Sequence, residues 1–348
     1  MLEFLQNAKV LITGHTGFKG SWLSIILRGR CKELLGLSLP LSNENQFFID
    51  LGIEKQMKSE YVNLMNYDHV EQVIKEFQPD YIFHFAAQSL VQRGYDDPIN
   101  TFKSNVLGTQ NLLEILRCNK IGATIIVATT DKVYRNNDLG IPFRETDELG
   151  GVDPYSASKV ATEHLIYCYY KSYFMSGNTK IGVARAGNVI GGGDWNKDRI
   201  IPDIIKAAQN KLLLKIRAPE STRPWQHVLE PLFGYLKFAK WLNRVETPNF
   251  EIFNFGPDQI NVQPVKDVVS QMCLYFPEIK VVTERPKNKE ALSLSLNADK
   301  AKTLLGVSSK LDFKDTIHKT ASWYVKLIGG EHPMYLCERD IRKYLSNE

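Results

Sequence analysis

The sequence lacks the features of a membrane or secreted protein. No apolar run is long enough to span a bilayer, and the first residues carry no basic stretch ahead of an apolar segment. The five cysteines are an odd number and include no Cys-x-x-Cys pair, which argues against a zinc site and a disulfide framework. We therefore expect a soluble cytoplasmic protein with free thiols, no membrane partner and no metal.

Long runs of one charge are also missing. The 348 residues include 43 Lys and Arg against 39 Asp and Glu, a net charge of +4, and the basic residues are scattered. This pattern argues against a nucleic-acid partner and suits an anionic small-molecule ligand. With 43% hydrophobic residues the chain can bury a large core, and its length suggests about two domains.

A glycine motif stands near the start of the chain. Residues 8–13 predict a buried strand, Gly14-His-Thr-Gly-Phe-Lys-Gly20 follows it, and a helix is expected from Ser21 to about Arg28. Glycines at positions one, four and seven allow a tight turn and let the backbone approach a phosphate, with the helix amides facing it. An ordinary glycine loop is the alternative, but the place between a strand and a helix favours a dinucleotide-binding fold.

Strands and helices alternate along the chain. The expected strands are 34–39, 81–86, 123–128, 181–184 and 250–255, and the expected helices include 68–77, 97–118 and one that begins at Tyr155. This alternation predicts an α/β fold, a Rossmann-type doubly wound parallel sheet. Residues 185–195 predict a glycine-rich loop. We expect residues 1–185 plus 225–261 to form the dinucleotide-binding domain, and residues 186–224 plus 262–348 a smaller, discontinuous α/β substrate domain.

Two short motifs in the middle of the chain suggest chemistry. Thr129-Thr-Asp-Lys132 closes an expected strand, and Tyr155-Ser-Ala-Ser-Lys159 opens an expected helix. Tyr155 and Lys159 are four residues apart, so they share one face of that helix. A nearby ammonium lowers the pKa of a tyrosine, as a base that oxidises an alcohol requires. Taken alone, the pair also fits an amphipathic helix start with an incidental Tyr and Lys.

Together these motifs carry a family likeness. The glycine motif with Tyr-x-x-x-Lys resembles the extended short-chain dehydrogenase/reductase family, and Thr130-Asp131 resembles its nucleotide-sugar 4,6-dehydratases. Three further runs, 86–91, 184–195 and 222–228, resemble the CDP-glucose branch of these dehydratases. The likeness covers nearly the whole chain. Many of these dehydratases have Glu after the catalytic Asp, whereas this chain has Lys132, as the CDP-glucose branch does.

The resemblance implies NAD as the cofactor. The second strand is followed by no acid before Glu44, so this position alone does not distinguish NAD from NADP. The implied catalytic residues are Thr130, Asp131, Lys132, Tyr155 and Lys159. Cofactor contacts are implied for Gly14, Gly17, Phe18, Lys19, Gly20, Asn63, Ala86, Ala87, Gln88, Asn105, Thr129, Tyr155 and Lys159. Substrate contacts are implied for Ser89, Asn188, Arg199, Arg223, Gln226 and His227.

The implied substrate is a CDP-hexose with a free 6-hydroxyl. Tyr155 would take the 4-hydroxyl proton while hydride leaves C4, Asp131 would protonate the departing 6-hydroxyl, and the hydride would return to C6. The product would be a 4-keto-6-deoxy sugar, as in deoxysugar biosynthesis for lipopolysaccharide O-antigen. The base at C5 stays open: Lys132 serves if its pKa falls toward neutrality, and otherwise it stabilises the enolate as a cation.

Other interpretations remain at this point. A nucleotide-sugar 4-epimerase uses the same Tyr and Lys but expels no water, and Asp131-Lys132 argues against it. A regulatory or scaffold protein that binds the cofactor without turnover is the other alternative, and the complete set Thr130, Asp131, Tyr155 and Lys159 argues against that. Arg199 and Arg223 suit a diphosphate but also a solvated surface, and His227 suits a ligand or the core. His84 and the run Tyr167, Tyr169, Tyr170, Tyr173 and Phe174 are expected to be structural. In this family the helices at 97–118 and from 155 often form a dimer interface, which implies a homodimer.

Overall fold

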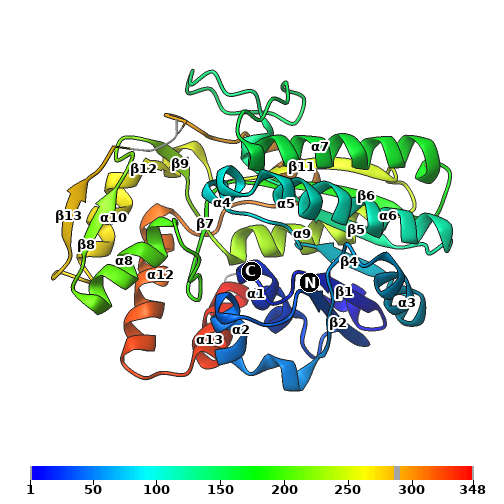
Figure 1. The fold of residues 1–348 in the computed structure, drawn as a ribbon, viewed down its shortest axis with the longest axis horizontal. Helices are drawn as coiled ribbons and strands as arrows, with labels where there is room; N and C mark the ends of the chain where they lie inside the picture. Colours follow the sequence, from blue (N-terminus) through cyan, green and yellow to red (C-terminus); the bar gives the residue numbers. More distant parts are fainter. Residues whose placement is uncertain (1, 286–290, 347–348) are drawn as a thin grey trace.

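The centre of the molecule is a seven-stranded sheet in which every pairing is parallel (Figure 1). A computed structural model describes residues 2–285 and 291–346. The strand order is β3-β2-β1-β4-β5-β6-β11. These strands are β1 (Lys9–Thr13), β2 (Glu33–Ser38), β3 (Lys58–Tyr61), β4 (Tyr81–His84), β5 (Thr124–Ala128), β6 (Lys180–Ala186) and β11 (Phe250–Phe255). The winding reverses between β1 and β4, where doubly wound sheets bind ligands beyond the carboxyl ends of their strands.

Helices cover both faces of this sheet. α1 (Phe18–Leu27) and α9 (Leu229–Leu242) pack on one face, and α3 (Tyr67–Phe77), α6 (Gly108–Cys118) and α7 (Pro154–Tyr169) on the other (Figure 1). A large cluster of buried apolar side chains lies between each layer of helices and the sheet. The other helices are α2 (Gln46–Leu51), α4 (Val91–Asp96), α5 (Pro98–Phe102), α8 (Ile200–Asn210), α10 (Val265–Cys273), α11 (Asp299–Leu305), α12 (Phe313–Ile328) and α13 (Pro333–Ser346). The predicted Rossmann-type doubly wound fold is confirmed.

The helices that frame the site begin for local reasons. α7 starts where Asp153 accepts a hydrogen bond from the Ser156 amide at 2.9 Å and Pro154 occupies the first turn. The predicted helix at 97–118 is helical from α5 to α6, with a π-helical turn at residues 103–107. The expected start of α1 at Ser21 is three residues late, because the helix begins at Phe18, directly after Gly17. Its first amides therefore follow the glycine motif at once.

The expectation of a loop throughout residues 185–195 is wrong. β6 continues to Ala186, and β7 (Val189–Ile190) pairs with β10 (Gln226–His227). Nearby, β9 (Thr222–Pro224) pairs with β12 (Val262–Pro264), and β8 (Leu213–Ile216) pairs with β13 (Lys280–Thr283). Pairing supplies hydrogen bonds to backbone groups that burial would otherwise leave without partners. The partner strands are far apart in the sequence, so local periodicity does not reveal them.

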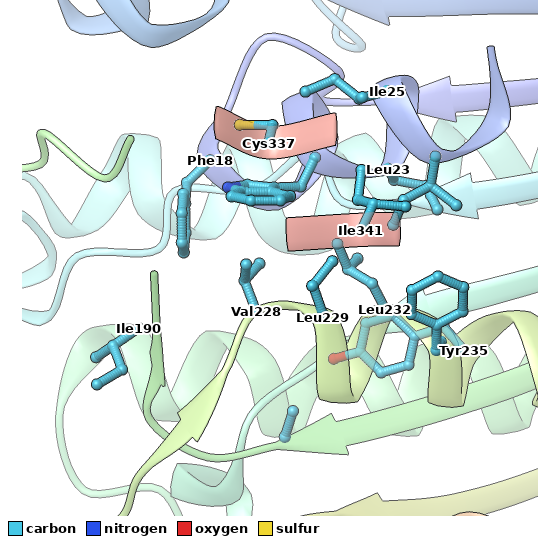
Figure 2. Close-up of a cluster of buried hydrophobic side chains, with 14 of the residues drawn as sticks. Phe18, Leu23, Ile25, Ile190, Val228, Leu229, Leu232, Tyr235, Cys337 and Ile341 are labelled. Carbon is cyan, nitrogen blue, oxygen red and sulfur yellow. The ribbon is translucent and has the colours of Figure 1, made fainter. Parts of the chain in front are cut away.

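The last helix, α13, packs against the first, α1. Cys337 and Ile341 of α13 point into the same apolar cluster as side chains of α1 and α9 (Figure 2). The predicted division into two domains stays a prediction, and residues 1, 286–290 and 347–348 of those domains lie outside the described residues. Within residues 2–285 and 291–346, no helix is both long and apolar enough to cross a membrane. No group of three or more His, Cys, Asp or Glu in that part could hold a metal ion.

Candidate active site

At the carboxyl ends of β1 and β4, where the winding of the sheet reverses, the backbone is closely packed. Gly14 has a φ of +73°, and a Cβ added to it would lie 2.7 Å from the Ala86 nitrogen. A Cβ on Gly20 would lie 2.1 Å from the Gly14 carbonyl oxygen. The N-cap residue of α1 is Gly17, which has no side chain to cap the helix, so the first amides of α1 suit an anion. The predicted glycine motif therefore fits the pyrophosphate of a dinucleotide.

The predicted catalytic residues meet at the carboxyl end of β5. The Thr130 hydroxyl donates to Asp131 Oδ1 at 3.1 Å and accepts from the Lys132 amide at 3.3 Å. Lys159 Nζ donates to the Ala128 carbonyl oxygen at 3.3 Å, which ties α7 to the end of the same strand. Tyr155, one turn before Lys159, is buried. A strand end and a helix start thus hold an acid, a phenol and two amines at one place.

Burial dominates the electrostatics of this cluster. Asp131 is 2% exposed, its Oδ2 atom has no hydrogen-bond partner in the described part of the chain, and burial raises its pKa against the opposing charges of Lys132 and Arg223. Burial also lowers the pKa of Lys159 to about 8. An interior carboxyl group with a raised pKa can hold a proton and deliver it, which is what a general acid requires.

Tyr155 differs from the sequence-based expectation. Burial raises its pKa to about 12, although a hydrogen bond with Thr130 and the charge of Arg199 act in the opposite direction. The expectation that Lys159 lowers the pKa of Tyr155 is therefore wrong for the chain by itself. Removing the phenolate from water costs more free energy than the nearby positive charges contribute to its stability. In the chain by itself the phenol therefore holds its proton at neutral pH.

Lys19 lies farther into the site than its place in the glycine motif suggests. Its Nζ atom is 3.4 Å from the hydroxyl of Tyr235 on α9. Burial, followed by the charges of Arg199 and Lys159, lowers the pKa of Lys19 to about 7, while Asp131 acts in the opposite direction. Sequence reasoning missed Tyr235, because it lies in an apolar helix with no motif around it. Only the fold brings this second phenol close to Tyr155.

Two predicted cofactor contacts have partners inside the chain instead. Asn105 is 1% exposed; its Nδ2 atom donates to the Gln88 carbonyl oxygen and to Ser158 Oγ, and its Oδ1 atom accepts from the Gln88 amide. Thr129 is buried and donates to Glu163 Oε1 at 2.6 Å. In these positions the two side chains support Gln88 and α7. Their contact with the cofactor stays a prediction.

The predicted substrate residues divide into two groups. Arg199 bridges Asp194 Oδ2 at 3.0 Å and Ser89 Oγ at 3.3 Å, and Arg223 is close enough to Asp131 to lower its pKa. Asn188 is half-buried and pairs with the start of β10 through its carbonyl oxygen. These positions surround the catalytic cluster. The second group, Gln226 and His227, points into the interior.

The interior placement has specific partners. Gln226 Nε2 donates to the Phe255 carbonyl oxygen at 2.9 Å. His227 is fully buried, its Nδ1 atom accepts from the Leu229 amide, and its ring lies 6.1 Å from that of Trp22. Burial lowers the pKa of His227 to about 3, so the ring is neutral. This placement favours the core role of His227 over a ligand role, and both substrate contacts stay untested predictions.

The other predicted cofactor positions lie along the crevice. Ala86 and Ala87 follow β4 and are half-buried, whereas Asn63 is exposed and accepts from the Met65 amide through Oδ1. Gly17 immediately precedes α1. The ring of Phe18 lies in the apolar core (Figure 2), so any cofactor contact by that residue is through its backbone.

The residues expected to be structural are confirmed as such. Both ring nitrogens of His84 are hydrogen-bonded, to Thr13 Oγ1 at 2.7 Å and to Thr109 Oγ1 at 2.9 Å. In the aromatic run, Tyr170 stacks on Phe250 with ring centroids 4.9 Å apart. The Tyr169 hydroxyl donates to Glu114. These contacts join helices and strands, as the sequence predicted.

The chain is similar to known proteins over nearly its whole length. Residues 11–320 match the GDP-mannose 4,6 dehydratase family. The chain is also 36% identical to the CDP-glucose 4,6-dehydratase of Salmonella typhimurium, over 99% of this chain and 98% of that protein. The chain belongs to the GDP-mannose 4,6 dehydratase family. The likeness to nucleotide-sugar 4,6-dehydratases that the motifs suggested is thereby confirmed.

Solved structures of the GDP-mannose 4,6 dehydratase fold include both dehydratases and epimerases. The UDP-glucose 4-epimerase of Thermus thermophilus in complex with NAD aligns with a TM-score of 0.78 and 25% identity, over 90% of this chain and 98% of that one. The dTDP-glucose 4,6-dehydratase of Bacillus anthracis in complex with NAD aligns with a TM-score of 0.77 and 23% identity, over 92% and 97%. Because both classes share the fold, the choice between them rests on the site residues.

Proposed function

We propose that this chain is an NAD-dependent nucleotide-sugar 4,6-dehydratase, a lyase that converts CDP-glucose to CDP-4-keto-6-deoxyglucose and water. The observation that carries the proposal is the buried Asp131, whose raised pKa and unpartnered Oδ2 atom suit a proton donor. It lies beside the phenol and lysine that sugar oxidation requires. The 36% identity to a CDP-glucose 4,6-dehydratase over nearly the full length supports this assignment.

The close backbone packing at the ends of β1 and β4 supports a dinucleotide at this place. The tight contact between Gly14 and the residues after β4 keeps side chains out of the switch point, and the N-terminus of α1 faces the place of the pyrophosphate. When bound, NAD supplies the hydride acceptor for C4 and the hydride donor for C6. Both relatives of known structure named above are complexes with NAD.

The chain's own residues supply the proton transfers and the orientation of the sugar. Tyr155 in its phenolate form accepts the proton of the 4-hydroxyl, and Thr130 and the charge of Lys159 stabilise that form. The resulting 4-ketone acidifies the C5 proton, and Asp131 protonates the 6-hydroxyl as it leaves as water. Lys132, half-buried next to Asp131, acts at C5 as the base or as the cation beside the enolate. Arg199 and Arg223 bind the diphosphate, because a guanidinium matches phosphate geometry.

A 4-epimerase is the second candidate, because solved relatives of the same fold have that activity. An epimerase returns hydride to C4 and never expels the 6-hydroxyl, so it needs no buried acid at this position. Incubation with CDP-glucose and NAD, followed by alkali, distinguishes them: a dehydratase yields the absorbance of a 4-keto sugar. Recovery of only the starting sugar and its C4 epimer would support the epimerase instead.

Nucleotide choice gives a quantitative prediction. Cytosine presents an amino donor where uracil and thymine present a carbonyl acceptor, so a site built for that donor leaves a buried polar group unpaired with the wrong base, at about 1–3 kcal/mol. We expect kcat/KM for CDP-glucose to exceed that for UDP-glucose and dTDP-glucose by at least about tenfold. As a control, Arg223→Ala should weaken all three alike, because Arg223 is proposed to contact phosphate. Equal kcat/KM values for the wild type would refute the CDP assignment and leave the dehydratase chemistry standing.

We also propose that the protein acts as a homodimer in the cytoplasm, in deoxysugar synthesis for lipopolysaccharide O-antigen. Exposed apolar side chains gather on the helices proposed for the interface: Ile99 and Phe102 on α5, Tyr167 on α7, Tyr173 just after it, and Leu107 before α6. A patch of this kind on one face favours burial against a second copy.

The dimer is tested by sedimentation velocity. For the wild type the measured mass should be about twice the chain mass of 39.7 kDa. The Phe102→Lys variant should have the mass of a monomer, because dimerisation would bury the lysine charge at the interface. Val245→Lys, at an exposed apolar residue after α9, is the matched control and should leave the mass unchanged. A monomeric wild type would exclude the proposed interface.

A further inference from the structure

A buried ion pair lies directly behind Lys159. Arg185 on β6 donates from Nε and Nη2 to both carboxylate oxygens of Glu163, at 2.5–3.1 Å, and both side chains are 3% exposed or less. Glu163 is one turn after Lys159 on α7, and Lys159 is one turn after Tyr155, so the three share one helix face. The proposed mechanism uses Tyr155 and Lys159 but gives no task to this ion pair.

The hydrogen bonds of Glu163 fix where its charge lies. Its Oε1 atom also accepts from Thr129 Oγ1 at 2.6 Å. Arg185 in turn donates to the Tyr134 hydroxyl at 2.8 Å and to the Glu145 carbonyl oxygen at 3.1 Å. The carboxylate is therefore held from the end of β5 and from β6, while the Lys159 ammonium donates to the Ala128 carbonyl oxygen. Glu163 supplies a negative charge behind Lys159 without closing a hydrogen bond to it.

Lys159 needs such a charge. Burial lowers its pKa to about 8, and Glu163 is the group that acts in the opposite direction. Two titratable groups on other elements also interact with the charge of Lys159, which lowers the pKa of Lys19 on α1 and of His84 on β4. His84 is held neutral by burial, and Lys19 loses its proton near pH 7, below the range in which Lys159 titrates. Neither therefore replaces Glu163.

We propose that Glu163, held by Arg185, is a positioning residue that keeps Lys159 in its charged form next to Tyr155. This inference deepens the proposed function and rests on it for the role of Lys159 in sugar oxidation. Arg185 prevents the carboxylate from turning to pair with Lys159 directly, so the ammonium stays available on the side of the crevice. An incidental interior ion pair would have no influence on how Lys159 titrates.

The test measures the titration of Lys159 without using the reaction. Acetic anhydride acylates only neutral amines, so the extent of labelling at Lys159, read by peptide mass spectrometry across pH, gives its midpoint. We expect a midpoint near 8 in the wild type and a fall of at least about one pH unit in Glu163→Gln, the usual effect of losing a nearby opposite charge. Glu163→Asp, which keeps the charge, should restore most of the midpoint. An unchanged midpoint in Glu163→Gln overturns the inference.

Two further variants test whether a change in the Lys159 midpoint comes from lost charge or from a general loss of structure. Tyr134→Phe removes a hydrogen bond to Arg185 in the same interior cluster but removes no charge, so the Lys159 midpoint should stay. Glu163→Leu with Arg185→Met removes the carboxylate without stranding the guanidinium, and should lower the midpoint as Glu163→Gln does. The alkaline limb of the pH profile of kcat/KM should move with the labelling midpoint. A shifted midpoint with an unmoved limb would support the charge role of Glu163 and refute the role of Lys159 in the reaction.

Discussion

Replacing Tyr155 with phenylalanine should abolish oxidation at C4 while leaving the fold intact. The phenol is the group proposed to take the 4-hydroxyl proton, and loss of such a proton acceptor slows a reaction by about two to four powers of ten. Phenylalanine keeps the buried ring, which lies against α4: a Cβ added to Gly94 would be 3.2 Å from the Cβ atom of Tyr155. The measurement is the rate at which reduced nicotinamide appears when enzyme and CDP-glucose are mixed for a single turnover.

The matched control for this variant is Tyr167→Phe. Tyr167 lies on the same helix, but half of it is exposed and it lies three turns beyond Tyr155, so the same loss of a hydroxyl should leave the rate unchanged. Circular dichroism and the melting temperature of both variants should match the wild type. Appearance of reduced nicotinamide at the wild-type rate in Tyr155→Phe would remove this residue from the mechanism.

Lys159 sets the alkaline limit of the same step. Burial lowers its pKa to about 8, so its positive charge is fully present well below that pH and disappears as the pH rises through it. Burial raises the pKa of Tyr155 to about 12, so in the chain by itself the phenol does not titrate between neutral pH and about pH 9. A loss of activity in that range therefore reports the lysine.

The fold was predictable because its signals are local. Buried strands that alternate with amphipathic helices, and a glycine motif between the first strand and helix, are each readable from about ten neighbouring residues. The pairing of Val189–Ile190 with Gln226–His227 was not readable, because it depends on where a distant segment lies. The predicted start of α1 at Ser21 is late because Phe18 and Lys19 belong to the glycine motif and are nevertheless helical.

The sequence predicts those site residues that belong to short motifs, because such motifs can be recognised without knowing the fold. Thr130, Asp131, Tyr155 and Lys159 come from two segments, and the structure brings them together as expected. Sequence reasoning could not determine which side chains are already occupied, and Asn105 has all its hydrogen-bonding groups used inside the chain. It also could not weigh burial against charge, which decides that the Tyr155 pKa rises. Tyr235 and the Glu163–Arg185 pair belong to no motif and become visible only through tertiary contacts.

Replacing Asp131 with asparagine should separate the two halves of the reaction. Oxidation at C4 depends on Tyr155 and Lys159 and should survive, whereas loss of water should slow by about two to four powers of ten, the usual scale for removal of a general acid. Burial raises the pKa of the Asp131 carboxyl group, so it can carry the proton that the departing 6-hydroxyl needs. An amide of the same shape keeps the hydrogen bond from Thr130 but has no acidic proton to give.

The expected signature is an accumulated intermediate, because hydride cannot return to C6 until water has left. In a single turnover with CDP-glucose, Asp131→Asn should show reduced nicotinamide that forms at close to the wild-type rate and then persists, whereas in the wild type it decays. Asp340→Asn is the matched control: Asp340 is also buried and burial raises its pKa too, but it lies on α13, so both phases should stay normal. Equal slowing of both phases in Asp131→Asn would show that Asp131 orients the sugar, and the acid that releases water would then be a different group.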